Sequence, residues 1–359
     1  MTRTVQRDPT PRRIIGDGGS IADLEADGLD TAALLSLYEQ MVLLRVFDTR
    51  AVVYQRQGRI GTYAMFWGHE AIQVGAHFAL DSATDWVFPS YRESAIGLLR
   101  GLDAATVLAW WAGHPAGWWN PLELRLGSIA VPIASQVPHA VGAAWGMRLR
   151  GEVGCSLVFF GDGATSEGAF HEGINFAGVQ RAPVVLLCNN NGWALTTPIA
   201  QQTRAACLAD KAIGYGVAGV TVDGADVLAV HQAVAQALAR ARAGDGPTLV
   251  EAVHYRIAAH GTADDPSLYR DEERAEAERA NDCLTRYEGY LRRRGLLDDE
   301  LATRTAADAT ETVRRGMRAV EEMAAPDPAL VFDTTYSRPP ADLLRQRDEA
   351  LAALAEESA

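Results

Sequence analysis

Between residues 155 and 256 the chain alternates apolar runs with amphipathic segments, and this alternation constrains its fold more than any other feature. The apolar runs are predicted to be buried strands, namely Cys155–Phe160, Pro183–Cys188, Gly219–Val222 and Pro247–His254. The segments between them are predicted to be helices, around Glu167–Val179, Ala206–Tyr215 and Asp226–Ala243. Because strands and helices alternate, we predict the α/β class: a doubly wound, mostly parallel sheet with helices on both faces and a ligand crevice at the carboxyl ends of its strands.

The segments on either side of this region are predicted from composition and periodicity. Residues 1–30 are rich in Gly, Asp, Arg and Pro, which predicts a flexible N-terminal tail. Apolar residues at helical spacing predict a long helix over Thr31–Gln57, with Asp30 as its N-cap. After Pro266 the chain is charged and helical in pattern. We therefore expect a tail over residues 1–30, a main domain over 31–325 and a helical C-terminal extension over 326–359.

Charge and composition exclude several classes of protein. The 33 basic and 46 acidic side chains give a net charge of −13, which argues against a nucleic-acid-binding protein. No apolar run approaches the ~18 residues that a membrane span requires, and no secretory signal is recognisable at the start. The four cysteines form no C-x-x-C pair, so structural zinc is not expected. We expect a cytoplasmic protein without a membrane segment.

A glycine-rich turn and an asparagine cluster follow two neighbouring strands of the predicted sheet. Gly161-Asp162-Gly163 comes directly after the first strand, and Asn191, at the end of the second, lies 29 residues beyond Asp162. Glycines at such a turn let backbone amides approach a phosphate. One Asp, one Asn and a backbone carbonyl suit Mg²⁺ bound to a diphosphate. Either piece alone is more simply a tight turn or a loop cap, but together they predict a metal–diphosphate site.

Other phosphate-binding motifs fit this region poorly. The glycines run G-x-G-x-x-x-x-G, and the second strand ends in Asn where a dinucleotide fold has an acidic residue for the ribose. A dinucleotide is therefore a poor second candidate. The Walker sequence G-x-x-x-x-G-K-[ST] is absent.

Gly-Asp-Gly followed at this distance by Asn-Asn resembles the thiamine diphosphate motif. From about Leu34 to Val331 the chain resembles the α subunit of the decarboxylase component of 2-oxo acid dehydrogenase complexes. The resemblance also rests on four ordered segments, which are Gln55–Ile60, Trp67–Ala71, Phe88–Glu93 and Tyr255–Pro266 with its His260-Gly261-Thr262.

This resemblance implies roles for nine residues. It implies that Asp162, Asn191 and the main-chain carbonyl of Trp193 bind Mg²⁺, and that the amides of Gly163 and Ala164 face the diphosphate. Further implied contacts to the cofactor come from Tyr91 and Arg92 at the diphosphate, Ile133 under the bent cofactor, and His260 as the catalytic histidine on a loop.

The resemblance also implies partners and a reaction. Relatives carry the pyrimidine half of the site on a separate β subunit, so we expect an α₂β₂ heterotetramer that is an oxidoreductase only when assembled. Its expected reaction is oxidative decarboxylation of pyruvate or a branched-chain 2-oxo acid, with acyl transfer to a lipoyl-bearing acyltransferase component. An acetoin dehydrogenase α subunit, or an inactive paralogue that stabilises a β subunit, remains an alternative.

Two groups of conspicuous side chains are expected to be structural. The pairs Trp110-Trp111 and Trp118-Trp119 could line a substrate channel, but large aromatic residues usually pack in the core or at an interface. We therefore predict packing for them, against a partner subunit. Apart from His260, the histidines have no metal-ligand spacing and are expected to be structural or exposed.

Overall fold

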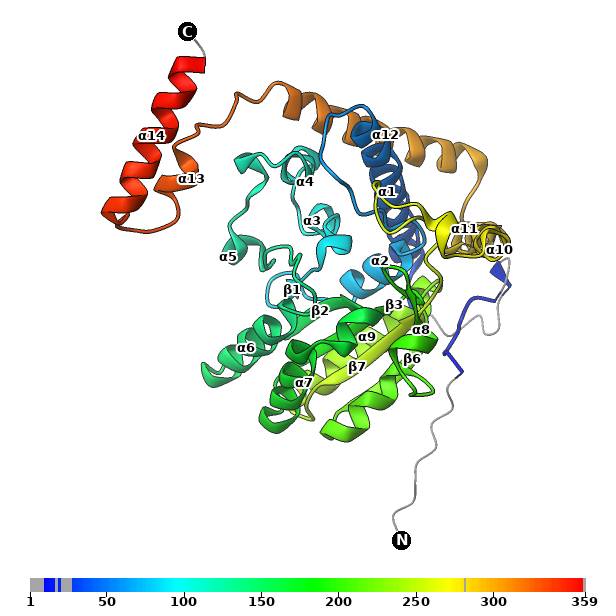
Figure 1. Ribbon diagram of the computed structural model, residues 1–359. Coiled ribbons are helices and arrows are strands. Elements are labelled where there is room, and N and C mark those ends of the chain that lie inside the picture. The colour runs from blue at the N-terminus through cyan, green and yellow to red at the C-terminus, as the bar shows by residue number, and fades with distance from the viewer. Residues whose placement is uncertain (1–9, 17–18, 21–27, 281, 358–359) are drawn as a thin grey trace.

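A five-stranded parallel sheet forms the centre of the molecule (Figure 1). The computed structural model describes residues 10–16, 19–20, 28–280 and 282–357. In spatial order the strands are β1 (Trp86–Phe88), β2 (Ser156–Gly161), β3 (Val184–Asn190), β7 (Thr248–Val253) and β6 (Ala218–Asp223). All neighbouring pairs are parallel. The predicted α/β class and doubly wound sheet are confirmed, with each of the four predicted strands within two residues of its expected start.

Alternate side chains of the central strands pack in two different hydrophobic clusters, one on each face of the sheet. Val158 and Phe160 of β2 pack with α6 (Gln136–Leu149) and α7 (Gly168–Gln180) on one face of the sheet. Their neighbours Leu157 and Phe159 pack with α2 (Glu70–Phe78) and α9 (Val227–Arg242) on the other face. Successive side chains of a strand point to opposite faces, so a strand covered on both sides is apolar on both, as Leu157–Phe160 of β2 are.

The crossovers explain why helices lie on both faces. The connections from β1 to β3 run in one direction across the sheet and place α6 and α7 on the same face. From β6 the chain returns toward β3 through α9 (Val227–Arg242), so a right-handed crossover places α9 on the opposite face. The helix predicted near residues 206–215 is the 3₁₀-helix η5 (Leu208–Tyr215), which ends at left-handed Gly216.

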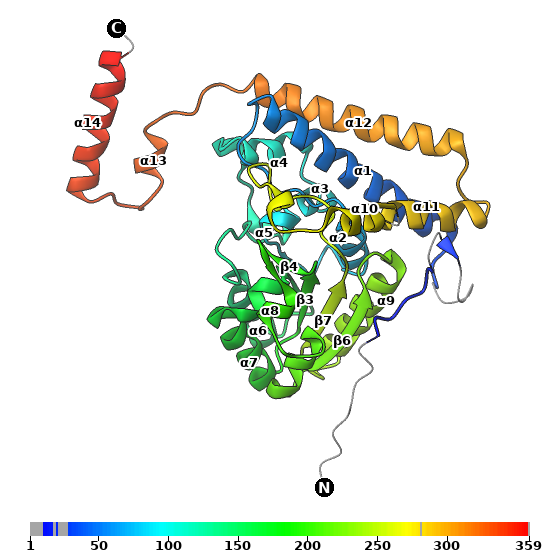
Figure 2. The same ribbon diagram turned by 45° about the vertical axis from the view of Figure 1, so that its right-hand side comes forward.

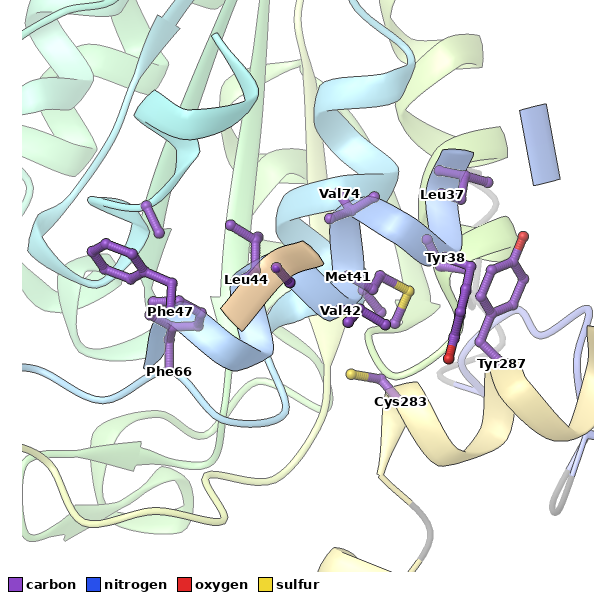
Figure 3. Close-up of a cluster of buried hydrophobic side chains, with 14 of the residues drawn as sticks. Leu37, Tyr38, Met41, Val42, Leu44, Phe47, Phe66, Val74, Cys283 and Tyr287 are labelled. Carbon is purple, nitrogen blue, oxygen red and sulfur yellow. The ribbon is translucent and has the colours of Figure 1, made fainter. Parts of the chain in front are cut away.

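A second layer of helices lies beyond α2 (Glu70–Phe78). Its longest members are α1 (Thr31–Arg56) and α12 (Asp299–Glu321), which lie side by side in Figure 2. Asp30 caps α1 by accepting a hydrogen bond from the Ala33 amide, as predicted. Figure 3 shows the apolar contact between α1 and its neighbours, where Met41 lies beside Cys283 of α11 (Cys283–Arg293).

The segment between residues 58 and 138, for which the sequence predicts no elements, contains short pieces of structure. Apart from α2 and β1 these are η2 (Tyr91–Glu93), α3 (Ile96–Leu99), α4 (Ala104–Trp111), η3 (Pro115–Gly117) and α5 (Pro121–Leu124). Except for α4, each of these pieces has three or four residues, which are too few to establish a hydrophobic period.

The chain ends differ from the predicted tails in one respect. Most of residues 1–30 lie outside the described part, but Arg12 pairs with Val222 beside β6. The amides of Ile14 and Ile15 donate to buried Asp226, and both side chains are buried. Residues 12–15 are therefore packed against the domain, and the prediction of a flexible tail is wrong for them. The reason is that two isoleucine side chains are buried and their amides donate to a buried carboxylate.

The C-terminal part is helical, as predicted. It contains α10 (Glu272–Ala280), α11, α12, α13 (Leu330–Asp333) and α14 (Ala341–Glu357), and both ribbon views place α13 and α14 away from the sheet. The three-part domain division stays a prediction. Within the described ranges, none of the helices combines the length and the hydropathy that crossing a membrane requires.

Candidate active site

A cavity of about 680 Å³ opens at the carboxyl ends of β2 and β3. This is the edge at which ligands bind in parallel α/β sheets. All nine residues predicted from the sequence line it, namely Tyr91, Arg92, Ile133, Asp162, Gly163, Ala164, Asn191, Trp193 and His260. The fold therefore brings together residues that are up to 169 positions apart (260 − 91) in the chain.

Asp162 opens the 3₁₀-helix η4 (Asp162–Ser166), directly after β2, and its carboxylate is fully buried. Its Oδ2 accepts a hydrogen bond of 2.6 Å from Nε2 of Gln202. Its Oδ1 has no hydrogen-bond partner among the described residues. Burial raises the pKa of Asp162, because the charged form has lost its water. A buried, unpaired carboxylate oxygen is costly, and a bound cation would compensate for it.

The remaining donors suit Mg²⁺ better than a soft metal. Asn191 follows β3, and its Oδ1 accepts from the amide of Trp193 at 3.1 Å. No group of three or more His, Cys, Asp or Glu side chains in the described residues could hold a metal ion. A cation here must therefore take amide, carbonyl and external oxygens, which is the ligand set of Mg²⁺ with a diphosphate.

Gly163 is required for the shape of this site. A Cβ at this position would lie 2.7 Å from the Cβ of Ala194 in β4 (Trp193–Ala194). The glycine therefore lets the Asp162 turn and the segment after Asn191 approach each other closely. The residues present fit a magnesium–diphosphate group.

A buried polar network fixes the turn that carries Tyr91 and Arg92. Asn189 Nδ2 donates to Glu93 Oε1 at 3.0 Å, and Glu93 in turn accepts from the Ser90 hydroxyl. Asn189 Nδ2 also lies 2.9 Å from His69 Nδ1, while Asn189 Oδ1 lies 2.6 Å from His254 Nε2. Both histidines are thus structural, as predicted, and burial lowers the pKa of each.

His260 lies against Arg92 at the mouth of the cavity. Arg92 Nη2 contacts His260 Nδ1 at 3.1 Å and donates to the His260 carbonyl at 3.0 Å. The His260 amide donates to Asp264 Oδ2 at 2.7 Å. Burial, together with the charges of Arg92 and Arg256, lowers the pKa of His260 to about 4. The ring is therefore neutral at pH 7, and because guanidinium only donates, its proton lies on Nε2.

Three aromatic side chains contribute to the wall of the cavity. Trp110, Trp111 and Tyr63 line the cavity, and the rings of Tyr63 and Trp111 are 4.8 Å apart. Trp111 also packs against the hydrophobic core, as predicted, and its ring contacts that of Trp110, so this pair both packs and lines the cavity. Trp118 and Trp119 do not line the cavity.

Two contacts to the Asp162 turn were not predicted from the sequence. Gln202 binds the carboxylate of Asp162, and Lys211 donates to Thr165 of the same turn. One signal was available in the sequence, because Lys211 is the only lysine in the chain. Gln202 had no comparable signal.

Comparison with known proteins agrees with this geometry. The family described as "Dehydrogenase E1 component" matches residues 38–329. The 3-methyl-2-oxobutanoate dehydrogenase subunit alpha of Mycobacterium tuberculosis is 42% identical over 97% of this chain and 95% of its own length. The 2-oxoisovalerate dehydrogenase subunit alpha of Bacillus subtilis is 37% identical over 88% of this chain and 98% of its own. The pyruvate dehydrogenase E1 component subunit alpha of Staphylococcus epidermidis is 35% identical over 93% and 90%, respectively.

Both the family match and these identities extend over most of the chain. The sheet order, the turn after β2 and the asparagine after β3 provide the structural counterpart of that similarity. The chain therefore belongs to the dehydrogenase E1 component family, as the alpha subunit of a 2-oxo acid dehydrogenase of the branched-chain or pyruvate type.

Proposed function

We propose that this chain binds the diphosphate half of thiamine diphosphate through Mg²⁺ and, with a β subunit, oxidatively decarboxylates a branched-chain 2-oxo acid. The acyl group passes to a lipoyl arm of the acyltransferase component. The observation that carries the proposal is the buried Asp162 carboxylate, whose Oδ1 has no partner in the described part of the chain and which lines one cavity with Asn191 and His260. The family typically uses thiamine diphosphate.

Each predicted residue has a task that suits its chemistry. Asp162, Asn191 and the Trp193 carbonyl would hold Mg²⁺, while the amides of Gly163 and Ala164 would face the diphosphate. When bound, the cofactor supplies the carbanion chemistry of decarboxylation, and the protein supplies orientation and electrostatics.

The other four residues would bind or orient the cofactor, or transfer a proton. Tyr91 and Arg92 would reach the diphosphate from the turn before α3, and guanidinium suits phosphate oxygens because its donors form a planar fork. Ile133, which is 46% exposed and lines the cavity, would support the bent cofactor. His260 would serve proton transfer at Nε2 during acyl transfer to the lipoyl group.

The preference for a branched-chain substrate rests on two observations. The aromatic wall formed by Tyr63, Trp110 and Trp111 offers apolar surface to an aliphatic side chain. The two relatives named for branched-chain substrates are 42% and 37% identical to this chain, against 35% for the pyruvate enzyme named above.

The relatives are named alpha subunits, which implies a β-subunit partner. We further propose an α₂β₂ assembly in which the partner covers the mouth of the cavity. Three apolar side chains at this mouth, Val131, Ile133 and Leu195, are 56%, 46% and 57% exposed. Clustered exposed apolar side chains of this kind mark interaction sites.

Thermal melts of the co-purified α and β chains test the cofactor assignment. Mg²⁺ and thiamine diphosphate should stabilise only together, by ~2.7 kcal/mol at 100 times the dissociation constant. Asp162→Ala should abolish this shift, because it removes the single buried carboxylate oxygen without a partner at the turn. An undiminished shift in Asp162→Ala would show that the metal site lies elsewhere.

A further inference from the structure

The segment that follows β5 (Thr197–Pro198) donates hydrogen bonds to the Asp162 turn. This segment contains α8 (Ile199–Gln202) and η5, and both touch the turn or the helix after it. Gln202 Nε2 donates to Asp162 Oδ2 at 2.6 Å and to the Thr197 carbonyl at 3.0 Å. One amide group therefore ties the carboxylate to the backbone just before α8.

Lys211 holds the same turn from η5. Its Nζ donates to the Thr165 carbonyl at 2.9 Å and to the Thr165 hydroxyl at 2.8 Å. The hydroxyl in turn donates to the Asp162 carbonyl at 2.8 Å. The hydroxyl proton is thus used toward Asp162 while an oxygen lone pair accepts from the ammonium, so the two bonds are compatible.

Lys211 brings a charge as well as two hydrogen bonds. All other basic side chains of the chain, apart from histidines, are arginines. The Lys211 ammonium is half-buried, and Thr165 is fully buried. A buried hydrogen bond to an ammonium group is stronger than one between neutral groups. The contact therefore fixes the backbone of the turn as well as its electrostatic environment.

Together these contacts determine which oxygen of Asp162 is left without a partner. Gln202 occupies Oδ2, and Oδ1 is the buried oxygen without a partner in the described residues. Mg²⁺ tolerates little deviation from octahedral geometry, so a ligand that is free to rotate binds it less well. Groups that orient a metal ligand typically contribute 10–100-fold to metal affinity.

We propose that Gln202 and Lys211 are positioning residues, which hold the Asp162 turn so that Oδ1 is presented to the Mg²⁺ of the cofactor. Gln202 orients the carboxylate directly, and Lys211 acts through Thr165 on the backbone of Asp162. This inference rests on the proposed function, because it concerns the same metal site.

The test is a Mg²⁺ titration of the α and β chains purified together, at saturating thiamine diphosphate, followed by tryptophan fluorescence. Trp193 and Trp110 line the cavity and provide the signal. Gln202→Leu and Lys211→Met should each raise the Kd for Mg²⁺ by ~10–100-fold. Lys211→Arg keeps a charged donor and should fall between the wild type and Lys211→Met. Gln201→Leu, at the exposed neighbour of Gln202 on α8, is the matched control and should bind Mg²⁺ normally.

Melting temperatures without cofactor separate positioning from folding. A positioning role predicts weaker Mg²⁺ binding with a cofactor-free melting temperature close to that of the wild type in at least Gln202→Leu. Unchanged Mg²⁺ affinity in both Gln202→Leu and Lys211→Met would overturn the inference, whatever their melting temperatures. If the wild-type assembly itself shows no Mg²⁺-dependent binding, the proposed function fails first, so the two failures are distinguishable.

Discussion

His260 combines exposure to the cavity with a neutral ring, and its tautomer follows from a single contact. Because Arg92 donates to Nδ1, the ring offers an N–H at Nε2 toward the cavity. The lowered pKa of about 4 means that protonation in the free protein is unfavourable at neutral pH. An amide side chain could replace His260 as a hydrogen-bond donor, but it could not replace His260 in proton transfer.

Replacing His260 tests these roles. His260→Ala should lower reductive acylation of the lipoyl group by ~10²–10⁴-fold, the usual range for a lost acid or base. The stabilisation by Mg²⁺ and thiamine diphosphate should remain nearly intact. His260→Gln keeps an amide donor but cannot transfer a proton, so it should be as slow as His260→Ala. Full activity in both variants would mean that the His260 loop is structural.

Asp48 is a buried carboxyl group that is not part of the proposed metal site. Its Oδ1 accepts from the Tyr63 hydroxyl at 3.0 Å and from the Phe66 amide at 2.9 Å. Burial raises the pKa of Asp48 from 3.8 to about 7, because the ionised form has no water around it. Between these two pH values the folded chain keeps a proton that the unfolded chain has released.

Asp48 should therefore make the folded state less stable as pH rises from about 4 to 7. In Asp48→Asn, which keeps the Oδ1 acceptor, this slope should decrease by at most ~1.4 kcal/mol per pH unit, the value for one proton. Chemical denaturation at pH 5 and pH 8 measures the change. The stability gain of Asp48→Asn over the wild type should be larger at pH 8 than at pH 5. An equal difference at both pH values would contradict the argument.

At the scale of elements, close contacts between helices depend on single glycines. α12 crosses α4 at Gly316, where a Cβ would lie 2.6 Å from Ala104 Cβ and 2.9 Å from the backbone nitrogen of Ala105. Backbone atoms cannot move aside as a flexible side chain can. The crossing therefore requires a residue without a Cβ, although glycine disfavours a helix interior.

Gly316→Ala should destabilise the folded chain by ~1–3 kcal/mol despite its better helix propensity. The reason is the overlap with α4, and thermal or chemical denaturation measures it. Thr303→Ala, at an exposed position of the same helix, should change stability by no more than ~0.5 kcal/mol. Equal effects of the two substitutions would mean that α12 moves away from α4 without cost.

The elements also differ in how far the sequence predicted them. The runs that became β2 and β3 are predominantly apolar and are followed by glycine or asparagine, so strand and boundary were both recognisable. β1 has only three residues and pairs with β2, which follows it by 68 positions between Phe88 and Ser156. Its assignment depends on a partner strand, and no local pattern contains that information.

At the scale of the whole molecule, this chain carries one half of the proposed site. In the proposed function the pyrimidine half of the cofactor site is supplied by a β subunit. Purified alone, the chain should therefore give no turnover of any 2-oxo acid with an artificial electron acceptor. Assembled with its β subunit, it should show a higher kcat/KM for 3-methyl-2-oxobutanoate than for pyruvate. Turnover by the α chain alone would contradict the division of the site, and a preference for pyruvate would contradict the substrate assignment alone.

The sequence by itself determined the class of fold and the two halves of the metal–diphosphate motif. These depend on local properties: the hydrophobic period within a strand or helix, and glycines and asparagines directly after a strand. The cavity-lining positions of Tyr91, Arg92, Ile133 and His260 followed only from resemblance, because no local pattern links them to Asp162.

Only the tertiary structure decided how these residues are held. Arg92 meets His260 across 168 positions, and Gln202 reaches Asp162 across 40. Such contacts depend on which segments the sheet order brings side by side. No periodic pattern in the sequence indicates them. The packing of Arg12–Ile15 against β6 and Asp226, like the support of Thr165 by Lys211, exists for the same physical reason: each partner is supplied by another part of the fold.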